Sequence, residues 1–236
     1  MVLYFNNRDL VIPGDLIAKG KYLEGENTFR IGDEIYASRI GLVEFNNKRV
    51  NVVALRSFYI PTVGDIVIGK IVEVGLRGWM VDINSPFLAV LKTSEATSKP
   101  INPKNDDLAS ILDVGDLIIA KVIAYDRTRD PLITIRERGL GKIRSGQIVS
   151  VTPTKIPRVI GRKGSMISML KAETGCHITI AQNGMILVKG KVPALENLAI
   201  RAIKMIEKEA HTTGLTDRVT EMIRKEKEEL KRIGKL

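Results

Sequence analysis

The chain has 236 residues, of which 44% are hydrophobic, and a formal net charge of +10 at pH 7 that favours a polyanionic partner. This length suits two or three small domains, and no apolar run approaches the roughly 20 residues of a membrane-spanning helix. The N-terminus also lacks the basic-then-apolar pattern of a signal peptide, so we expect a cytoplasmic protein with no membrane partner.

A turn motif, Gly-Asp between apolar residues, recurs along the chain. Each copy precedes an alternating, β-branched segment, so the motif predicts the starts of strands in small curved sheets. The irregular spacing argues against a solenoid. These turns divide the chain into residues 1–62, 63–142 and 145–210 and a tail at 211–236. The copies are Gly14-Asp15, Gly32-Asp33, Gly64-Asp65 and Gly115-Asp116, with a weaker fifth at Ser145-Gly146.

Residues 1–62 are predicted to form a small β domain. Residues 33–40 and 48–55 are expected to pair around the Asn46-Asn47 turn. The segment carries no recognisable chemistry, which favours a docking role.

Residues 63–142 predict five strands at 66–74, 78–83, 87–91, 117–125 and 132–136. A long polar connection, residues 92–113, separates the third strand from the fourth, as in an OB-fold barrel. The stretches Val63–Ile71 and Gly78–Ile83 resemble the ribosomal S1-type RNA-binding domain.

S1-type domains typically present two aromatic residues and a histidine to RNA, whereas this segment offers Trp79 and Phe87 with no histidine nearby. Trp79 has two open interpretations, a base-stacking residue or a barrel core residue. Basic residues are further candidates for RNA contact, although each could be a solvated surface charge and Asp126 and Asp130 offset two of them. They are Arg77, Lys121, Arg127 and Arg129.

Residues 159–175 place a Gly-x-x-Gly loop, Gly161-Arg162-Lys163-Gly164, at the start of an amphipathic helix. Glycines allow close approach of a sugar-phosphate strand, the helix N-terminus offers unpaired N–H groups, and Arg162 and Lys163 add positive charge. Residues 142–175 contain seven basic residues and one acidic residue, Glu173. The loop therefore predicts a phosphate-binding site.

The loop, its helix, the Gly175 cap and the strand 178–180 together resemble a KH domain, which clamps single-stranded RNA or DNA. A turn at 182–184, a strand at 185–189 and a helix at 193–210 complete this pattern. The apolar face of that helix is assigned to the core. The tail is expected to be a solvated helix or a partner contact, because its apolar positions are sparse.

Nothing in the sequence predicts an active site, a metal site or a cofactor. Cys176 is the single cysteine and is expected to pack in the core, and the two histidines form no visible pair with it. Asp65 and Asp116 lie in turns, where we expect them to bond the backbone. A metal-dependent nuclease built from distant carboxylates is the enzymatic alternative, but no enzyme is expected.

The order of domains, with the KH motif, resembles the RNA-binding cap subunit of the archaeal RNA exosome. The resemblance implies an α+β multidomain protein that binds single-stranded RNA without cleaving it. It also implies docking through the N-terminal segment to a ring of RNase PH-type subunits, beside copies of itself or another cap protein. An S1/KH transcription or translation factor is the alternative. Polynucleotide phosphorylase carries similar modules in reversed order, and this chain has no room for its catalytic core.

Overall fold

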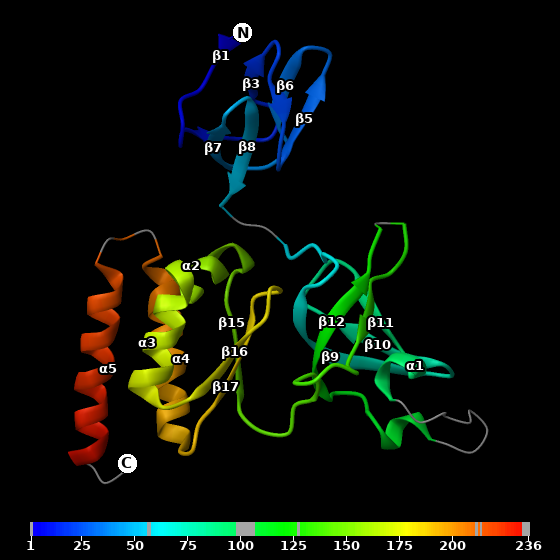
Figure 1. The fold of residues 1–236 in the computed structure, drawn as a ribbon, viewed down its shortest axis with the longest axis vertical. Helices are drawn as coiled ribbons and strands as arrows, with labels where there is room; N and C mark the ends of the chain where they lie inside the picture. The colour runs from blue at the N-terminus through cyan, green and yellow to red at the C-terminus, as the bar shows by residue number, and fades with distance from the viewer. Residues whose placement is uncertain are drawn as a thin grey trace. The chain divides into compact units, whose positions relative to one another are not determined.

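The computed structural model describes residues 2–55, 58–97, 107–126, 128–210, 212 and 214–232, and it separates the chain into two units, Met1–Ser57 and Phe58–Leu236 (Figure 1). The division falls a few residues before the one expected at residue 62. The reason is Tyr59, whose side chain is buried in the core of the second unit. Its hydroxyl donates a hydrogen bond to Asp65 Oδ2 at 2.7 Å, which ties this segment to the following turn.

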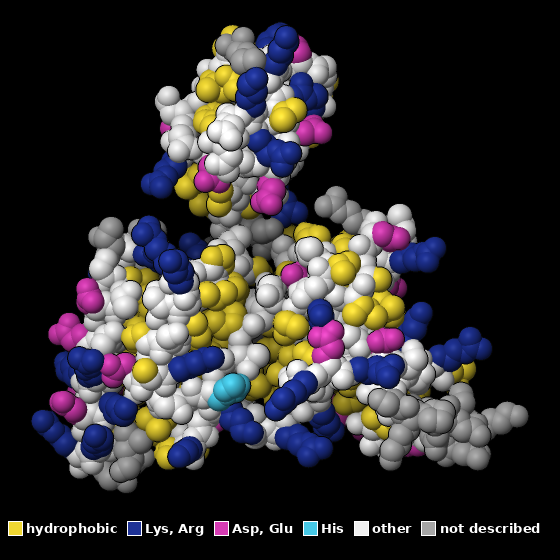
Figure 2. Space-filling model, in the orientation of Figure 1, with side chains coloured by type: hydrophobic (Ala, Val, Ile, Leu, Met, Phe, Trp, Pro, Cys, Tyr) yellow, Lys and Arg dark blue, Asp and Glu magenta, His cyan; other side chains and the backbone are white. Residues whose placement is uncertain are grey.

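Two four-stranded sheets make up the described part of the first unit, in the orders β1-β3-β6-β5 and β2-β7-β8-β4. Apolar side chains from both sheets, among them Ile17, Ile35 and Val43, pack into one core. Other large hydrophobic side chains remain on the surface of this unit (Figure 2). The strands are β1 Val2–Leu3, β2 Leu10–Val11, β3 Leu16–Lys19, β4 Leu23–Glu24, β5 Thr28–Ile31, β6 Glu34–Ala37, β7 Gly41–Asn46 and β8 Arg49–Ala54.

The strand pairing expected in this unit is partly wrong. Residues 48–55 do form a hairpin around the Asn46-Asn47 turn, but their partner is β7, with Gly41 opposite Ala54. The segment expected as partner contains β6, which pairs instead with β5 and β3. Gly32 joins β5 to β6 with φ +62°, a conformation that suits a tight hairpin turn. β6 therefore pairs with β5, the strand that is nearer to it in the sequence.

The second unit begins with a closed five-stranded barrel, which confirms the predicted OB fold. The strands run in the order β13-β11-β10-β9-β12, and pairing of β13 with β12 closes the sheet. The β11–β13 pairing is parallel and the other four are antiparallel. The elements are β9 Ile66–Gly75, β10 Gly78–Asp82, β11 Leu88–Lys92, α1 Thr93–Ala96, η1 Leu108–Ser110, β12 Leu117–Ala124, β13 Leu132–Thr134 and β14 Gly141–Lys142, which pairs with β12.

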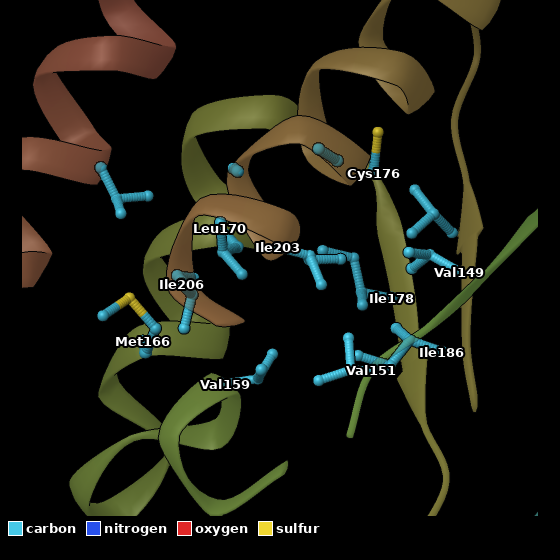
Figure 3. Packing of buried hydrophobic residues seen from close by; sticks show 14 of the residues in the cluster. Val149, Val151, Val159, Met166, Leu170, Cys176, Ile178, Ile186, Ile203 and Ile206 are labelled. Atoms are coloured by element: carbon cyan, nitrogen blue, oxygen red, sulfur yellow. The ribbon is translucent and has the colours of Figure 1, made fainter. Parts of the chain in front are cut away.

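The KH domain follows, with a three-stranded antiparallel sheet in the order β15-β17-β16. Ile186 and Val188 of β17 pack with helix residues such as Leu170 and Ile203, and Figure 3 shows this core from close by. The elements are β15 Gln147–Ser150, η2 Pro153–Lys155, α2 Ile156–Ile160, η3 Arg162–Gly164, α3 Ser165–Thr174, β16 His177–Ile180, β17 Met185–Lys189, α4 Pro193–Lys208 and α5 Leu215–Arg232.

The other face of the KH sheet packs against the barrel. Leu187, which alternates with Ile186 and Val188 along β17, joins Ile68 of β9 and Ala181 in a separate hydrophobic cluster. The sheet thus lies between the KH helices and the barrel (Figure 1). Because both faces of β17 are covered, its sequence is a continuous apolar run rather than an alternation of apolar and polar residues.

The turn that joins β16 to β17 connects the KH domain to the barrel through hydrogen bonds. Asn183 is fully buried, and its side-chain amide donates to Ile68 O at 2.7 Å and to Ile83 O at 2.8 Å. Its Oδ1 accepts from the Ile68 N–H at 3.3 Å, and Gln182 exchanges two hydrogen bonds with Ile66. The β9–β10 pairing stops at Lys70, so this turn satisfies backbone groups of β9 that β10 leaves without partners.

The C-terminal helix α5 is not simply a solvated tail, and that expectation is wrong for its apolar face. Leu215, Val219 and Ile223 are buried in the KH core. Their spacing of four residues makes a narrow stripe along one side of the helix. Ion pairs add to the contact, with Arg224 of α5 bonded to Glu173 of α3 at 2.7 Å.

The expectations for Asp65 and Asp116 in turns and for Cys176 in the core are confirmed. The carboxylates of Asp65 and Asp116 accept hydrogen bonds from the backbone N–H three residues earlier, at 3.2 and 2.8 Å. The glycines ahead of them have φ near +98° and +94°. Cys176 is buried in the KH core, and burial raises the pKa of its thiol. Among the described helices none is long and apolar enough to span a membrane.

Candidate nucleic-acid interface

The Gly-x-x-Gly loop joins two helices at one end of the KH domain. It follows α2, and Gly164 caps the N-terminus of α3. Three of its four residues have positive φ, +76° at Gly161, +50° at Lys163 and +78° at Gly164. This backbone turns the loop outward, so Arg162 and Lys163 are both exposed at its tip. The N-terminus of α3 and two cations thus meet at one place, which suits a phosphate.

The two glycines of the loop carry different constraints, and this difference can be measured. A Cβ on Gly161 would lie 2.7 Å from Met166 N and 2.8 Å from Met166 Cβ, inside the first turn of α3. A Cβ on Gly164 would meet only Ile167 Cγ2, at 3.8 Å. We expect Gly161→Ala to lower the free energy of unfolding by about 2–3 kcal/mol, through backbone strain and the clash.

Gly164→Ala is the comparison variant, since Gly164 lies in the αL region (φ +78°, ψ +14°) and its Cβ would not clash, whereas Gly161 (φ +76°, ψ +172°) lies in a region that essentially only glycine adopts. It should cost only about 1 kcal/mol. Urea unfolding followed by far-UV circular dichroism measures both values. Equal losses for the two variants would show that α3 does not pack over the loop as described.

The positive charge of Arg162 and Lys163 is not neutralised by an ion pair within the part of the chain that the structure describes. Glu173, the acid nearest in sequence, is engaged by Arg224, which lowers the pKa of its carboxyl. Figure 2 shows Lys and Arg side chains gathered over the α2 end of the KH domain. The loop is therefore a cationic tip, as its sequence predicts.

Not every basic residue counted around the loop belongs to this tip. Lys142 pairs with Asp116 of the barrel. Arg158 donates from Nη2 to Thr212 O at 2.7 Å, which attaches α2 to the segment before α5. Asp116 therefore offsets the charge of Lys142, whereas Arg158 keeps its charge but is tied to a backbone carbonyl.

Trp79 is a core residue, which decides between its two open interpretations against base stacking. Its side chain is 1% exposed and lies among Ile71, Leu91 and other barrel residues. The indole Nε1 donates to Leu112 O at 2.7 Å, so the long connection after β11 satisfies its polar group. A buried indole offers no face to a base. The choice between the two interpretations depends on which side of β10 faces inward.

Two hollows lie on the outer surface of the barrel. The first, of about 690 Å³, is lined by Arg77, Met80, Val90, Lys92 and Glu73, among others. The second, of about 620 Å³, shares Val90 and Lys92 with the first and adds Tyr125 and Arg129. Arg77 and Arg129, predicted from sequence, thus lie in different hollows.

Of the remaining predicted barrel residues, Lys121 lines neither hollow. Lys121 forms an ion pair with Glu137 at 2.8 Å, so part of its charge is neutralised. Arg127 lies outside the described residues. Sequence reasoning misses Lys92 and Tyr125, both of which line hollows. Lys92 falls in the predicted polar connection, although it ends β11 and its exposure alternates with that of buried Leu91.

Three domain families match the chain in order. Residues 8–56 match the exosome RNA binding protein RRP4 N-terminal domain, residues 58–124 the RRP4 S1 domain and residues 146–208 the KH domain. The exosome complex component Rrp4 of Thermofilum pendens is 43% identical over 226 residues, which span 94% of this chain and 95% of that protein. The chain belongs to the Rrp4 family of exosome complex components.

Other members of the Rrp4 family agree with this assignment. The protein of Pyrococcus abyssi is 46% identical over 236 residues, covering 98% of this chain and 88% of its own. A crystal structure assigned as an exosome complex RNA-binding protein superposes with a TM-score of 0.70 at 48% identity. It covers 73% of this chain and 98% of its own. In this Rrp4-family chain, no group of three or more potential metal ligands occurs within the described residues.

Proposed function

We propose that this Rrp4-family chain is a non-catalytic, RNA-binding cap subunit of the exosome. In this proposal it docks on a ring of RNase PH-type subunits, beside further copies of itself or another cap protein, and passes single-stranded RNA into the ring. The observation that carries the RNA-binding part is the exposed Arg162-Lys163 tip between two positive-φ glycines, at the N-terminus of α3.

Such a site contacts the sugar-phosphate backbone of RNA and does not distinguish base sequences. Phosphate contacts position a nucleic acid, whereas contacts to base edges specify it. The described groups at the tip are two cations beside the N-terminus of α3, an arrangement that favours phosphate oxygens. Low sequence discrimination suits a subunit that delivers many RNAs for 3′-to-5′ degradation.

The N-terminal unit has the surface expected of a docking domain. Isolated hydrophobic residues are normal on protein surfaces, whereas a contiguous exposed apolar patch commonly marks an interaction site. Leu10, Ile12 and Leu23 are each more than half exposed. Ile31 and Val53 have similar exposure. A ring subunit that covers these side chains would remove them from water and gain hydrophobic free energy.

The alternative of a free transcription or translation factor is not supported by the comparisons. Such factors share S1 and KH modules. However, residues 8–56 match the N-terminal domain of an exosome protein, and the relatives that align with nearly the whole chain are named as exosome components.

Gel filtration with light scattering tests the docking part of this proposal. The chain is mixed with an RNase PH-type hexamer from the same source, and co-elution at a larger mass is the expected result. Deletion of residues 1–57 is the control, because it removes the first unit and keeps Tyr59 in the barrel core. The deletion variant should elute alone. Separate elution of the intact chain and the hexamer would contradict ring docking.

A further inference from the structure

The turn between β16 and β17 contains the single Asn-Gly pair of the chain, Asn183-Gly184. The turn depends on asparagine because the side-chain amide bonds both Ile68 and Ile83. An ionised aspartate would offer no N–H donor to the two carbonyls, and a glutamine would add a methylene group to a fully buried site.

The next position depends on glycine. Gly184 has φ +85°, and a Cβ at this position would lie 2.3 Å from Val151 O and 3.2 Å from Pro153 Cγ. Its own carbonyl accepts from the Val151 N–H at 2.7 Å, so the two backbones cannot move apart without losing a hydrogen bond. Two separate requirements, one for each residue, therefore place an Asn-Gly pair at the contact between the barrel and the KH domain.

An Asn-Gly pair readily loses its side-chain amide, because glycine has no Cβ to shield its nitrogen. In this reaction the Gly184 nitrogen attacks Asn183 Cγ. A bond forms between these two atoms, the Cγ–Nδ2 bond breaks, and ammonia leaves with the proton of the Gly184 N–H. Water then opens the succinimide ring at either of its carbonyls, which leaves isoaspartate or aspartate at position 183.

The closed contact holds both reacting groups. The Gly184 N–H donates to Ala181 O at 3.3 Å. Asn183 Nδ2 is held by the Ile68 and Ile83 carbonyls at 2.7 and 2.8 Å, and the Asn183 carbonyl accepts from Asn84 Nδ2 at 2.9 Å. Ring closure removes the Gly184 proton and Asn183 Nδ2, so it breaks the hydrogen bonds that these atoms make. The reaction therefore requires the turn to leave the barrel.

The product cannot restore this contact. An ionised carboxylate only accepts hydrogen bonds, yet the closed site presents the carbonyl oxygens of Ile68 and Ile83 to it in a fully buried position. Burial of a charge beside two acceptors carries a large desolvation cost that no partner offsets. The converted turn therefore stays outside the barrel, and the packing of Ile68 with Ala181 and Leu187 is weakened.

We propose that Asn183-Gly184 is a modification site controlled by the contact between the barrel and the KH domain. The closed contact protects the side-chain amide, whereas opening allows its conversion to aspartate or isoaspartate. The converted chain then keeps the two domains apart. Water is the co-reactant and ammonia the leaving group. This inference goes beyond the proposed function and does not depend on RNA binding.

The test measures conversion at position 183 in the full chain at mildly alkaline pH and a temperature well below its unfolding midpoint, with and without denaturing urea. Peptide mapping by mass spectrometry gives the converted fraction, and enzymatic carboxyl methylation detects isoaspartate. We expect conversion in the folded chain to be at least about a hundredfold slower than in urea, which corresponds to an opening free energy of roughly 3 kcal/mol. Equal rates, or no conversion in urea, would overturn the proposal.

Gln182→Ala separates local opening from global unfolding. It removes the 2.9 Å hydrogen bond to the Ile66 N–H and leaves the Asn-Gly pair intact, so we expect conversion to be about fivefold faster. Gly164→Ala is the matched control, because it should cost a similar free energy in the loop before α3. It should leave the rate unchanged. Equal acceleration by both variants, or none by Gln182→Ala, would overturn control by the contact.

Converted chains also test the consequence of the reaction directly. Conversion adds a negative charge, so ion exchange separates converted from unconverted molecules of the unsubstituted chain. Thermal unfolding is then followed by the fluorescence of Trp79, the single tryptophan, which lies in the barrel core. The converted molecules should unfold at a lower midpoint. An unchanged midpoint would overturn the claim that conversion keeps the domains apart.

Discussion

Reversing both charges of the loop, Arg162→Asp with Lys163→Asp, should weaken RNA binding more than any other surface change in this chain. The two cations are exposed and lack ion pairs within the described residues, so their charge is available to phosphates. Every phosphate that the protein no longer neutralises lowers the log-log slope of affinity against salt by about 0.7 for single strands. We expect the slope to fall by about 1.4 and the affinity to drop at least about tenfold at low salt.

Fluorescence anisotropy with a labelled single-stranded RNA across a range of salt concentrations measures both quantities. Lys225→Asp with Lys231→Asp on α5 is the matched control, because it makes the same change in net charge on exposed positions of another helix. The control should alter the slope little. Equal flattening in both variants would mean that net charge, rather than the loop, governs binding.

Asn183→Ala should be the most destabilising single change at the junction of the barrel and the KH domain. It removes three hydrogen bonds and leaves the buried carbonyls of Ile68 and Ile83 and the Ile68 N–H without partners. A buried polar group left unsatisfied costs about 1–3 kcal/mol. We expect a loss of about 3 kcal/mol or more in the free energy of unfolding, with a lower midpoint in thermal unfolding.

Gln182→Ala is the comparison, because it removes one side-chain hydrogen bond, to the Ile66 N–H, at a more exposed position of the same turn. It should cost about 1 kcal/mol. Calorimetry on both variants gives the stability difference, and a barrel transition separated from a KH transition in the Asn183 variant would show directly that the turn couples the two domains. A loss below about 1 kcal/mol for Asn183→Ala would contradict this role.

Local patterns predict most of the elements that carry the candidate site. The barrel strands, the KH loop and α4 lie within a few residues of their predicted positions, because a period of two or 3.6 residues and glycine-containing turns involve neighbouring positions. The buried face of α4, with Leu198, Ala202 and Ile206, follows its apolar stripe. The chemistry of Arg162 and Lys163 also needs only the loop and the helix that follows it.

Other features could not be predicted from the sequence because they depend on contacts between residues that are far apart in the chain. The few apolar residues of the tail favour solvent exposure, yet three residues at a spacing of four suffice where α3 and α4 offer a matching surface. The partner of residues 48–55 differs from the predicted one because the Gly32 turn gives β6 a nearer partner. In both cases the sequence allows several neighbours, and packing selects one.

The sequence by itself determined the domain order, the cationic Gly-x-x-Gly loop and the curved, strand-rich barrel, all of which rest on residues close together in the chain. Only the tertiary structure decided that Trp79 fills the barrel and that Asn183 fastens one domain to the other. The physical reason is separation along the chain. Asn183 bonds Ile68 across 115 positions, and the partner of such a contact is fixed by sheet register and burial rather than by any local pattern.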